Sequence, residues 1–232
     1  MTMCIVTRSQ PGALATATEL EHMGYVPLVV PAAIIIPTDA GISTDGVQAL
    51  LMTSAAAARN ARASQAALNL PVYAVGDATA QAASDAGFRT VISAGGDGAA
   101  LAVLAADRMK TADGALLHLR GSEIAGDVTA MLETCGFQTR FVEVYMTRDH
   151  PDFGDKITQA LANNSGFILL HSPAGTRRLL SALGQAGQDL GAWCVVAISP
   201  ACLTNLQNEG FGKLIAAEQP DEMSLLAALA AH

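Results

Sequence analysis

Short apolar runs alternate with longer amphipathic stretches along almost the whole chain. The apolar runs predict ten strands, at about residues 4–7, 26–36, 48–53, 72–76, 90–93, 115–119, 138–146, 166–171, 194–198 and 213–217. After the first of them, Ala13, Ala17 and Leu20 recur at helical spacing before Gly24. Regular alternation of strands and helices is typical of an α/β fold, in which helices cover both faces of parallel sheets.

The second half of the chain repeats the first. Arg8, Leu20, Glu21 and Gly24 recur 112 residues later, as Arg120, Leu132, Glu133 and Gly136. The segment from Leu51 to Ser54 recurs as Leu169 to Ser172, and that from Val72 to Phe88 recurs as Val195 to Phe211. The offset grows in small steps, as loop insertions in a duplicated α/β unit would make it grow.

Each half also carries the same signal for the end of a helix. Glycine is followed by an aromatic residue at Gly24-Tyr25, Gly87-Phe88, Gly136-Phe137 and Gly210-Phe211. Glycine can end a helix in the left-handed conformation, and the next residue then packs back on the last turn. We expect these four glycines to serve the fold.

Two domain arrangements fit the repeat. A tandem arrangement would divide the chain near residue 111. A crossed arrangement would pair the apolar run 27–37 with the alternating run 141–147 as a two-stranded antiparallel bridge. Residues 1–36 and 148–232 would then form one discontinuous lobe, and residues 38–145 an inserted lobe, with Tyr145 at the waist of a cleft. The periodicity alone leaves both arrangements open.

Composition supports two globular domains. The chain has 232 residues, of which 51% are apolar and 15% charged, enough for two cores of about 100 residues each. The longest apolar stretch, from Val26 to Ile36, is interrupted by Pro27 and Pro31, which favours a buried strand over a membrane span. The N-terminal apolar stretch is short for a signal peptide, so we expect a cytoplasmic protein with no membrane partner.

Charge and cysteine usage exclude further classes. The net charge of −8 and the presence of only three lysines argue against nucleic acid as a partner. Cys4, Cys135, Cys194 and Cys202 have no metal-ligand spacing and are expected to be small core residues. Because no convincing phosphate-binding loop is present either, we expect no metal and no organic cofactor.

Several short segments, taken together, resemble the uroporphyrinogen-III synthase family. Their order and spacing cover nearly the whole chain, although no single one is specific. The matching segments are Val6-Thr7-Arg8, Gly24-Tyr25, Met52-Thr53-Ser54, Tyr73-Ala74-Val75-Gly76 with Thr79-Ala80, Leu119-Arg120-Gly121, Val144-Tyr145-Met146-Thr147, Leu170-His171-Ser172-Pro173 and Ala197-Ile198-Ser199-Pro200.

This resemblance implies a fold and an activity. The fold would be two flavodoxin-like lobes joined by the two-stranded bridge, which selects the crossed arrangement. The activity would be that of a lyase acting in haem biosynthesis, which closes hydroxymethylbilane to uroporphyrinogen III with inversion of ring D. Such an enzyme needs no cofactor and works mainly by holding one folded conformation of a reactive substrate. We expect a monomer.

The resemblance also implies site residues. Tyr145 matches a family tyrosine that faces the cleft, where its hydroxyl, protonated at neutral pH, could donate a proton to the departing substrate hydroxyl. Without the resemblance, Tyr145 would be taken as a β-favouring aromatic residue. Ser54, Ser172 and Thr79 would bind substrate at strand ends, although Ser54 and Ser172 also fit helix N-caps.

Two positions depart from the family pattern. Where the family commonly has a pair of hydroxyl residues, this chain has Ser199-Pro200-Ala201-Cys202, so backbone amides of Ser199, Ala201 and Cys202 would make the contact there. His171 replaces the usual Thr or Ser and could bind substrate or serve the fold. The candidate partners for substrate carboxylates are Arg8 and Arg120, with Arg59, Arg148 and Arg177 as further candidates.

Two other readings of the sequence compete with a synthase. A two-lobed protein could bind a small molecule without catalysis, although most such proteins are exported. A two-lobed glycosyltransferase usually has a longer chain and a nucleotide-phosphate site, and the segment Gly95-Gly96-Asp97-Gly98 looks only like a loop before a helix.

Overall fold

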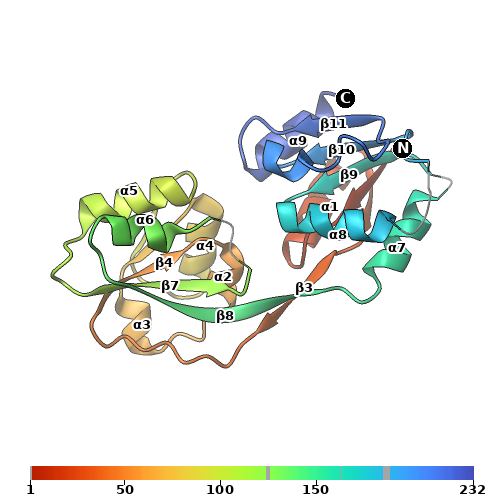
Figure 1. Cartoon of the computed structure of the whole chain (residues 1–232). Helices are drawn as coiled ribbons and strands as arrows, with labels where there is room; N and C mark the ends of the chain where they lie inside the picture. Colours follow the sequence, from red (N-terminus) through yellow and green to blue (C-terminus); the bar gives the residue numbers. More distant parts are fainter. Residues whose placement is uncertain (1, 124–125, 163, 185–188) are drawn as a thin grey trace. The chain divides into compact units, whose positions relative to one another are not determined.

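The chain folds into two compact units, each with its own sheet (Figure 1). A computed structural model describes residues 2–123, 126–162, 164–184 and 189–232. Unit 1 consists of Met1–Ile34 and Arg148–His232, and unit 2 of Ile35–Thr147. The prediction of an α/β fold is confirmed.

Unit 1 is built on a five-stranded sheet with the order β11-β10-β9-β1-β2, and all its strand pairs are parallel. Numbered within the unit, this order is 2-1-3-4-5 read from the β2 edge, which is the order of flavodoxin-like sheets. The strands are β1 (Met3–Val6), β2 (Val26–Val29), β9 (Gly166–Leu170), β10 (Trp193–Ala197) and β11 (Lys213–Ala216).

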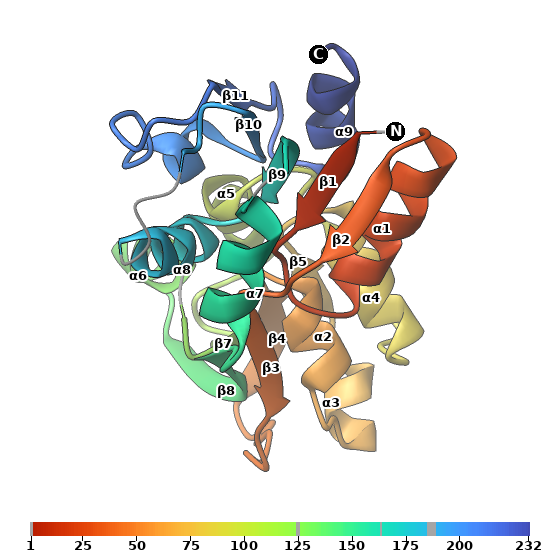
Figure 2. The same cartoon turned by 90° about the vertical axis from the view of Figure 1, so that its right-hand side faces the viewer.

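Helices cover both faces of this sheet (Figure 2). One core contains Cys4 and Val6 of β1 together with side chains of α1 (Gly12–His22) and α9 (Glu222–Ala230). The opposite core contains Ile5 and side chains of α7 (Phe153–Leu161), α8 (Pro173–Leu183) and the short 3₁₀ helix η1 (Pro200–Leu203). Alternate residues of β1 therefore enter opposite cores, as expected for a strand buried on both faces.

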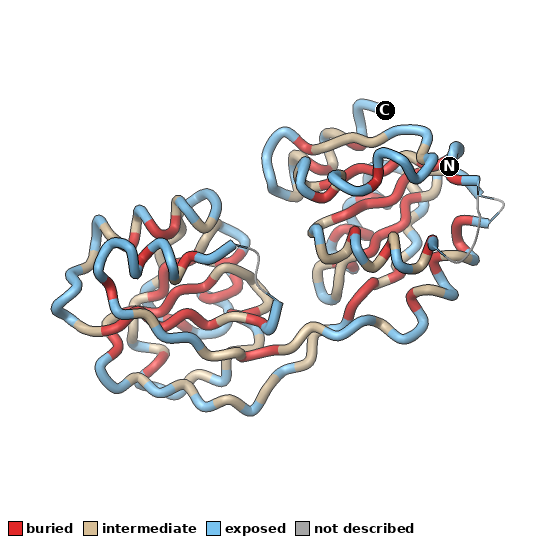
Figure 3. Tube along the Cα trace, in the orientation of Figure 1, coloured by how far each residue is buried: buried red, intermediate tan, exposed pale blue. Residues whose placement is uncertain are grey.

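Unit 2 has a six-stranded sheet with the order β3-β8-β7-β4-β5-β6. From β8 to β6 its strands take the places that β2, β1, β9, β10 and β11 take in unit 1. Its central strands are the most buried part of the unit (Figure 3). Helices α2, α3 and α4 lie against one core, and α5 and α6 against the other. The elements are β3 (Ala33–Pro37), β4 (Val47–Met52), α2 (Ala55–Asn60), α3 (Gln65–Asn69), β5 (Val72–Ala74), α4 (Asp77–Asp85), β6 (Val91–Ser93), α5 (Gly98–Arg108), β7 (Ala115–Gly121), α6 (Val128–Thr134) and β8 (Thr139–Asp149).

The division between the units falls within β3 and within β8, which are neighbours in the six-stranded sheet. Thr38 N donates to Val144 O at 3.0 Å, and His150 N donates to Ala32 O at 3.1 Å. Residue numbers rise along one segment as they fall along the other, which is the pattern of an antiparallel pair.

The expectation of one buried strand over residues 26–36 is wrong. The run forms two strands, β2 and β3, that belong to different sheets. Pro31, which has no backbone N–H, lies in the break between them. Because β2 is the edge strand of its sheet, Val26 and Leu28 remain 42% and 36% exposed.

The predicted helix ends are confirmed at three of the four glycines. Gly24, Gly87 and Gly136 follow α1, α4 and α6, with φ between 85° and 92°. The N–H of the following aromatic residue returns to the last turn, as in the bond from Tyr25 N to Leu20 O of 2.9 Å. Gly210 also has a positive φ of 82°, but it follows irregular turns instead of an α-helix.

Two further expectations concern cysteines and membranes. Cys4 and Cys202 are buried as predicted, Cys194 is partly buried, and Cys135, at the C-terminal end of α6, is exposed. Within the described residues, no helix has both the length and the apolar character required to cross a bilayer.

Candidate active site

Each sheet has one point, called the switch point, at which the connections from two neighbouring strands run in opposite directions along the sheet. Ligands of doubly wound folds bind beside this point, at the carboxyl ends of the strands. In unit 1 it lies between β1 and β9, and in unit 2 between β7 and β4. The residues that follow these strands are Thr7 and Arg8, His171 and Ser172, Thr53 and Ser54, and Ser122. Four of the predicted site residues, Arg8, Ser54, His171 and Ser172, therefore lie directly at one of the two switch points.

In unit 2, Tyr145 lies beside Ser54. The two hydroxyl oxygens are 3.1 Å apart, although 91 residues separate them in the chain. Ser54 caps helix α2 by accepting the N–H of Ala57 at 3.1 Å, which confirms the N-cap interpretation. Tyr145 is only 8% exposed, and its ring belongs to the core beneath α2. The neighbouring strand β7 presents Gly121 opposite Tyr145.

Thr79 lies further along the same edge of unit 2. It is in the first turn of α4, where its backbone N–H bonds to Gly76 O at 3.0 Å. Its side chain is buried, with 6% exposure. The structure therefore places Thr79 near a strand end, as expected, but largely buried.

A buried histidine, His118, lies beside the same switch point of unit 2. The sequence analysis did not single it out. Nε2 of His118, on β7, is 3.0 Å from the hydroxyl of Thr53, the residue before Ser54. His118 is 1% exposed. Burial, and then the charge of Arg120, lower the pKa of His118 to about 4, so its ring is neutral at pH 7.

Arg120 is already engaged by neighbouring side chains. Its Nη2 lies 3.3 Å from Oε1 of Glu143, and its guanidinium carbon lies 3.6 Å from the centre of the Phe141 ring. The Arg120 side chain is 14% exposed, and its Nε is buried without a hydrogen-bond partner in the described structure. Arg120 is thus held against Glu143 and Phe141 within unit 2.

In unit 1, Ser172 repeats the role of Ser54. Its hydroxyl accepts the N–H of Gly175 at 3.0 Å and caps α8, whose first residue is Pro173. The N-cap interpretation is therefore confirmed for both serines. Because α8 starts at the switch point, its N-terminus faces the position where a ligand of this sheet would bind.

His171 and Arg8 meet at one carboxylate, that of Glu222 in the first turn of α9. Arg8 Nη1 and His171 Nε2 lie 2.5 Å and 3.2 Å from Oε2 of Glu222, and Thr16 donates its hydroxyl to Oε1 at 2.5 Å. The His171 side chain is 7% exposed, and its Nδ1 is buried without a hydrogen-bond partner in the described structure. Arg8 is thus neutralised by a protein carboxylate.

Burial and charge set the protonation of this cluster. Burial alone would raise the pKa of Glu222, but the contacts with His171, Thr16 and Arg8 outweigh it and lower the pKa to about 2. Burial lowers the pKa of His171, and the hydrogen bond to Glu222 opposes this effect. At pH 7 Glu222 is therefore ionised, and the neutral form of His171 is favoured.

The three predicted site residues after β10, Ser199, Ala201 and Cys202, differ from one another in burial. Ser199 precedes η1, and its Oγ is 3.5 Å from Sγ of Cys202. Cys202 is fully buried, and burial raises the pKa of its thiol. Ala201 is exposed. The Cys202 side chain thus belongs to the core, and the Ser199 hydroxyl and backbone groups of this turn remain for a ligand.

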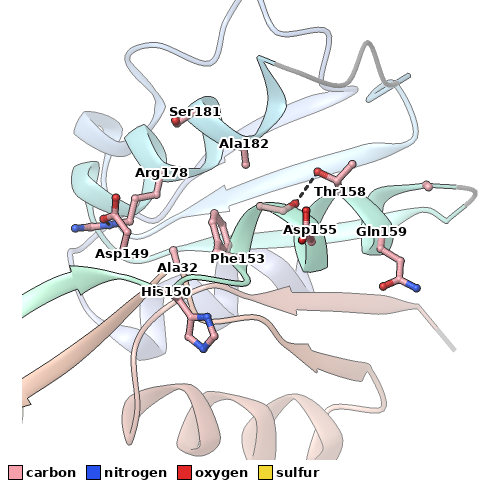
Figure 4. Close-up of a pocket in the computed structure, with 12 residues that line it drawn as sticks. Ala32, Asp149, His150, Phe153, Asp155, Thr158, Gln159, Arg178, Ser181 and Ala182 are labelled. Carbon is pink, nitrogen blue, oxygen red and sulfur yellow. Dashed lines mark hydrogen bonds and ion pairs between the residues drawn. The ribbon is translucent and has the colours of Figure 1, made fainter.

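The described structure of unit 1 also has a surface cavity of about 670 Å³ beside α7 and α8 (Figure 4). It is lined by Asp149, His150 and Arg178 among others, and Arg178 Nε bonds to Asp149 Oδ1 at 2.7 Å. None of the sequence-predicted site residues lines it. The three further candidate arginines, Arg59, Arg148 and Arg177, are exposed.

Sequence reasoning missed Glu222, His118 and Gly121 as parts of the site. A histidine within the apolar run 115–119 was a signal for His118, because a polar residue in a buried strand needs a partner. Gly121 lay in one of the segments that resemble the family, but no function was predicted for it. Nothing near Glu222 in the sequence indicates its partners, which lie more than 50 residues away. In the described residues, no group of three or more His, Cys, Asp or Glu side chains could hold a metal ion.

Comparison with solved structures shows a shared fold. A uroporphyrinogen-III synthetase from Helicobacter pylori 26695 is 18% identical, with all of both chains covered and a TM-score of 0.67. A mutant uroporphyrinogen III synthase from the extremely thermophilic bacterium Thermus thermophilus is 14% identical, with 98% of this chain and 96% of that chain covered and a TM-score of 0.57. No curated protein sequence matches the chain significantly.

Comparison with protein families gives one match, to the family described as uroporphyrinogen-III synthase HemD, over residues 15–227. The matched range contains Ser54, Tyr145 and Ser172, and it leaves out Arg8. Because the match spans most of the chain, this chain belongs to the uroporphyrinogen-III synthase family.

Proposed function

We propose that this protein converts hydroxymethylbilane to uroporphyrinogen III, with Tyr145 as the proton donor. Membership of the family places the chain among the cyclising lyases of tetrapyrrole biosynthesis. The assignment of Tyr145 rests on one observation: its hydroxyl oxygen lies 3.1 Å from that of Ser54, at the switch point of unit 2. A tyrosine there stands where a doubly wound sheet binds its ligand.

The reaction needs one proton donor and strict orientation. The substrate loses its terminal hydroxyl, the resulting azafulvene is attacked by the last pyrrole ring through a spiro intermediate, and the macrocycle closes with ring D inverted. Tyr145 supplies the proton that turns the departing hydroxyl into water. Since the bilane also closes unaided to the wrong isomer, the remaining task of the protein is to hold the productive conformation.

We further propose that the acidic side chains of the substrate bind mainly to hydroxyl and backbone N–H groups. Ser172 and the N-terminus of α8 offer such groups in unit 1, as do the backbone groups near Ser199 and Ala201. Arg8 and Arg120 already have Glu222 and Glu143 as partners, so they would contribute through their remaining N–H groups. Thr79 and His171 complete the proposed substrate-binding set.

The wider assignments follow from the same family. We propose that β3 and β8 form a two-stranded antiparallel bridge between two lobes, 1–36 with 148–232 and 38–145. We also propose a cytoplasmic monomer that binds neither nucleic acid nor membranes, in keeping with its net charge of −8. Turnover should need no cofactor, so chelation followed by exhaustive dialysis should leave it intact.

The decisive experiment offers freshly prepared hydroxymethylbilane to the purified protein and separates the oxidised products by isomer. The expected result is an excess of the type III isomer over a control without protein. Equal isomer profiles in the two samples would overturn the proposal. Binding of the bilane without a change of isomer would instead identify a two-lobed binding protein.

A further inference from the structure

Strand β8 contains an irregularity at Tyr145. Arg120 of β7 pairs with Glu143, but the next residue, Gly121, pairs with Tyr145, so Val144 is an extra residue in β8. Successive residues of a regular strand point to opposite faces. Val144 and Tyr145 nevertheless both belong to the core beneath α2. The bulge therefore turns Tyr145 onto the face where α2 begins.

Gly121 leaves the space that the Tyr145 ring occupies. A Cβ atom on Gly121 would lie 2.3 Å from Cζ and 2.7 Å from the hydroxyl oxygen of Tyr145. Any side chain at position 121 would push the ring away. Beyond the bulge, Ser122 N donates to Tyr145 O at 3.1 Å, so the backbone of Tyr145 is held in place.

Ser54 can fix the direction in which the Tyr145 proton points. A serine hydroxyl has one proton to donate and two lone pairs to accept. One lone pair of Ser54 accepts Ala57 N–H, and the Ser54 proton remains available for Tyr145 Oη, 3.1 Å away. When Ser54 donates, the Tyr145 proton is free for another acceptor.

We propose that Ser54 and Gly121 are positioning residues for Tyr145, with Ser54 donating its hydroxyl proton to Tyr145 Oη so that the Tyr145 proton points to the substrate. This inference rests on the proposed function and refines it, because Ser54 then acts through Tyr145 instead of binding substrate directly.

The proposed step conserves atoms, electrons and protons. The C–O bond of the substrate hydroxymethyl group breaks with its electron pair on oxygen, the Tyr145 proton passes to that oxygen, and water leaves. The tyrosinate that remains accepts a charge-assisted hydrogen bond from Ser54. It recovers a proton from the carbon that is deprotonated when the last pyrrole ring becomes aromatic again.

The first test replaces Ser54 and measures kcat and KM for type III product. Ser54→Gly removes the hydroxyl while a glycine N-cap costs only a few tenths of a kcal/mol, so kcat should fall about 10- to 100-fold with KM little changed. Ser54→Thr keeps both the cap and the donor and should retain most activity. Ser64→Gly, at the N-cap of α3, is the matched control and should leave kcat unchanged.

The second test uses pairs of variants. In a Tyr145→Phe background, Ser54→Gly and Gly121→Ala should each cause no further loss of kcat, because their effects act through the missing hydroxyl. Gly121→Ala alone should lower kcat as strongly as Tyr145→Phe. Its control is Gly41→Ala, at a position with open space around Cβ. A rise of KM at unchanged kcat in Ser54→Gly would overturn the proposal, since it would indicate direct substrate binding.

A spectroscopic test separates this inference from the proposed function. The chain has three tyrosines, so NMR of tyrosine labelled at the ring carbon bearing the hydroxyl gives few signals, and Tyr145→Phe identifies one of them. That signal should shift in Ser54→Gly and stay in place in Ser64→Gly. An unshifted signal would overturn the role of Ser54 even in an active enzyme. A shifted signal in a protein that makes no type III isomer would sink the proposed function alone.

Discussion

Arg8 Nη1 lies 2.5 Å from Oε2 of Glu222, although the two residues are 214 positions apart in the chain. Arg8 follows the first strand and Glu222 begins the last helix, so this ion pair joins the two ends of the chain within unit 1. Thr16 and His171 add hydrogen bonds to the same carboxylate. Glu222 therefore holds together the residues that follow β1 and β9 at the switch point of unit 1.

Replacing Glu222 by glutamine should destabilise unit 1 by about 1–2 kcal/mol, because the charged partner of Arg8 is lost while each side chain is about one-third exposed. Urea unfolding followed by Trp193 fluorescence measures this effect. Trp193 is the only tryptophan and is fully buried in unit 1. The control is Glu21→Gln on the exposed side of α1, and equal effects of the two changes would contradict the prediction.

Stability should depend on pH through His118. Its pKa is about 4 in the folded protein against an ordinary value of 6.5, so the unfolded chain binds more protons between these values. The contribution of the neutral ring is therefore complete above pH 6.5 and is lost as the pH falls towards 4, by about 3 kcal/mol. Urea unfolding followed by circular dichroism should show this loss.

The matched variant for this prediction is His118→Gln, which retains a polar group near Thr53 but does not titrate. Carboxylates titrate alike in both proteins, so the difference between their stability curves isolates His118. If the two curves run parallel from pH 7 to pH 4, His118 does not contribute in the way predicted.

Tyr145→Phe should lower kcat by about 10²-fold, the lower end for a positioned general acid, because the activated bilane ionises readily even unaided. Removal of one hydroxyl should leave the ring and its packing in place. The controls are Tyr25→Phe and Tyr73→Phe. Tyr25 packs edge to face on Phe167 with centroids 6.0 Å apart, and Tyr73 is buried against α5. Formation of type III product at the wild-type rate by Tyr145→Phe would refute the role of the hydroxyl.

Two glycines of unit 1 should respond in opposite directions to substitution by alanine. Gly166 has φ of 146°, and a Cβ there would lie 2.2 Å from Met3 O, so Gly166→Ala should cost about 2–4 kcal/mol. Gly154, in the first turn of α7, has open space, and Gly154→Ala should stabilise the helix by up to about 1 kcal/mol. Trp193 fluorescence during urea unfolding measures both changes, and a neutral Gly166→Ala would count against the strand contact.

Local sequence signals were sufficient for most of the elements, although they merged β2 and β3 into one strand. The apolar alternation located the strands, and the glycine-aromatic pairs located the ends of α1, α4 and α6. Ser54 and Ser172 were recognisable as N-caps because a cap bonds to a residue only three positions away. These features depend on neighbours within one or two turns of the chain.

The assembly of the candidate site depended on tertiary structure. Strand order decides that the loop after β1 meets α9, so the pairing of Arg8 with Glu222 has no local signal. The register between β7 and β8 decides that Tyr145 lies opposite Gly121, and one extra residue in that register changes the face on which the side chain lies. The helix caps and most strands were thus predictable from the sequence itself, whereas distances between side chains arose only when segments distant in the chain came together.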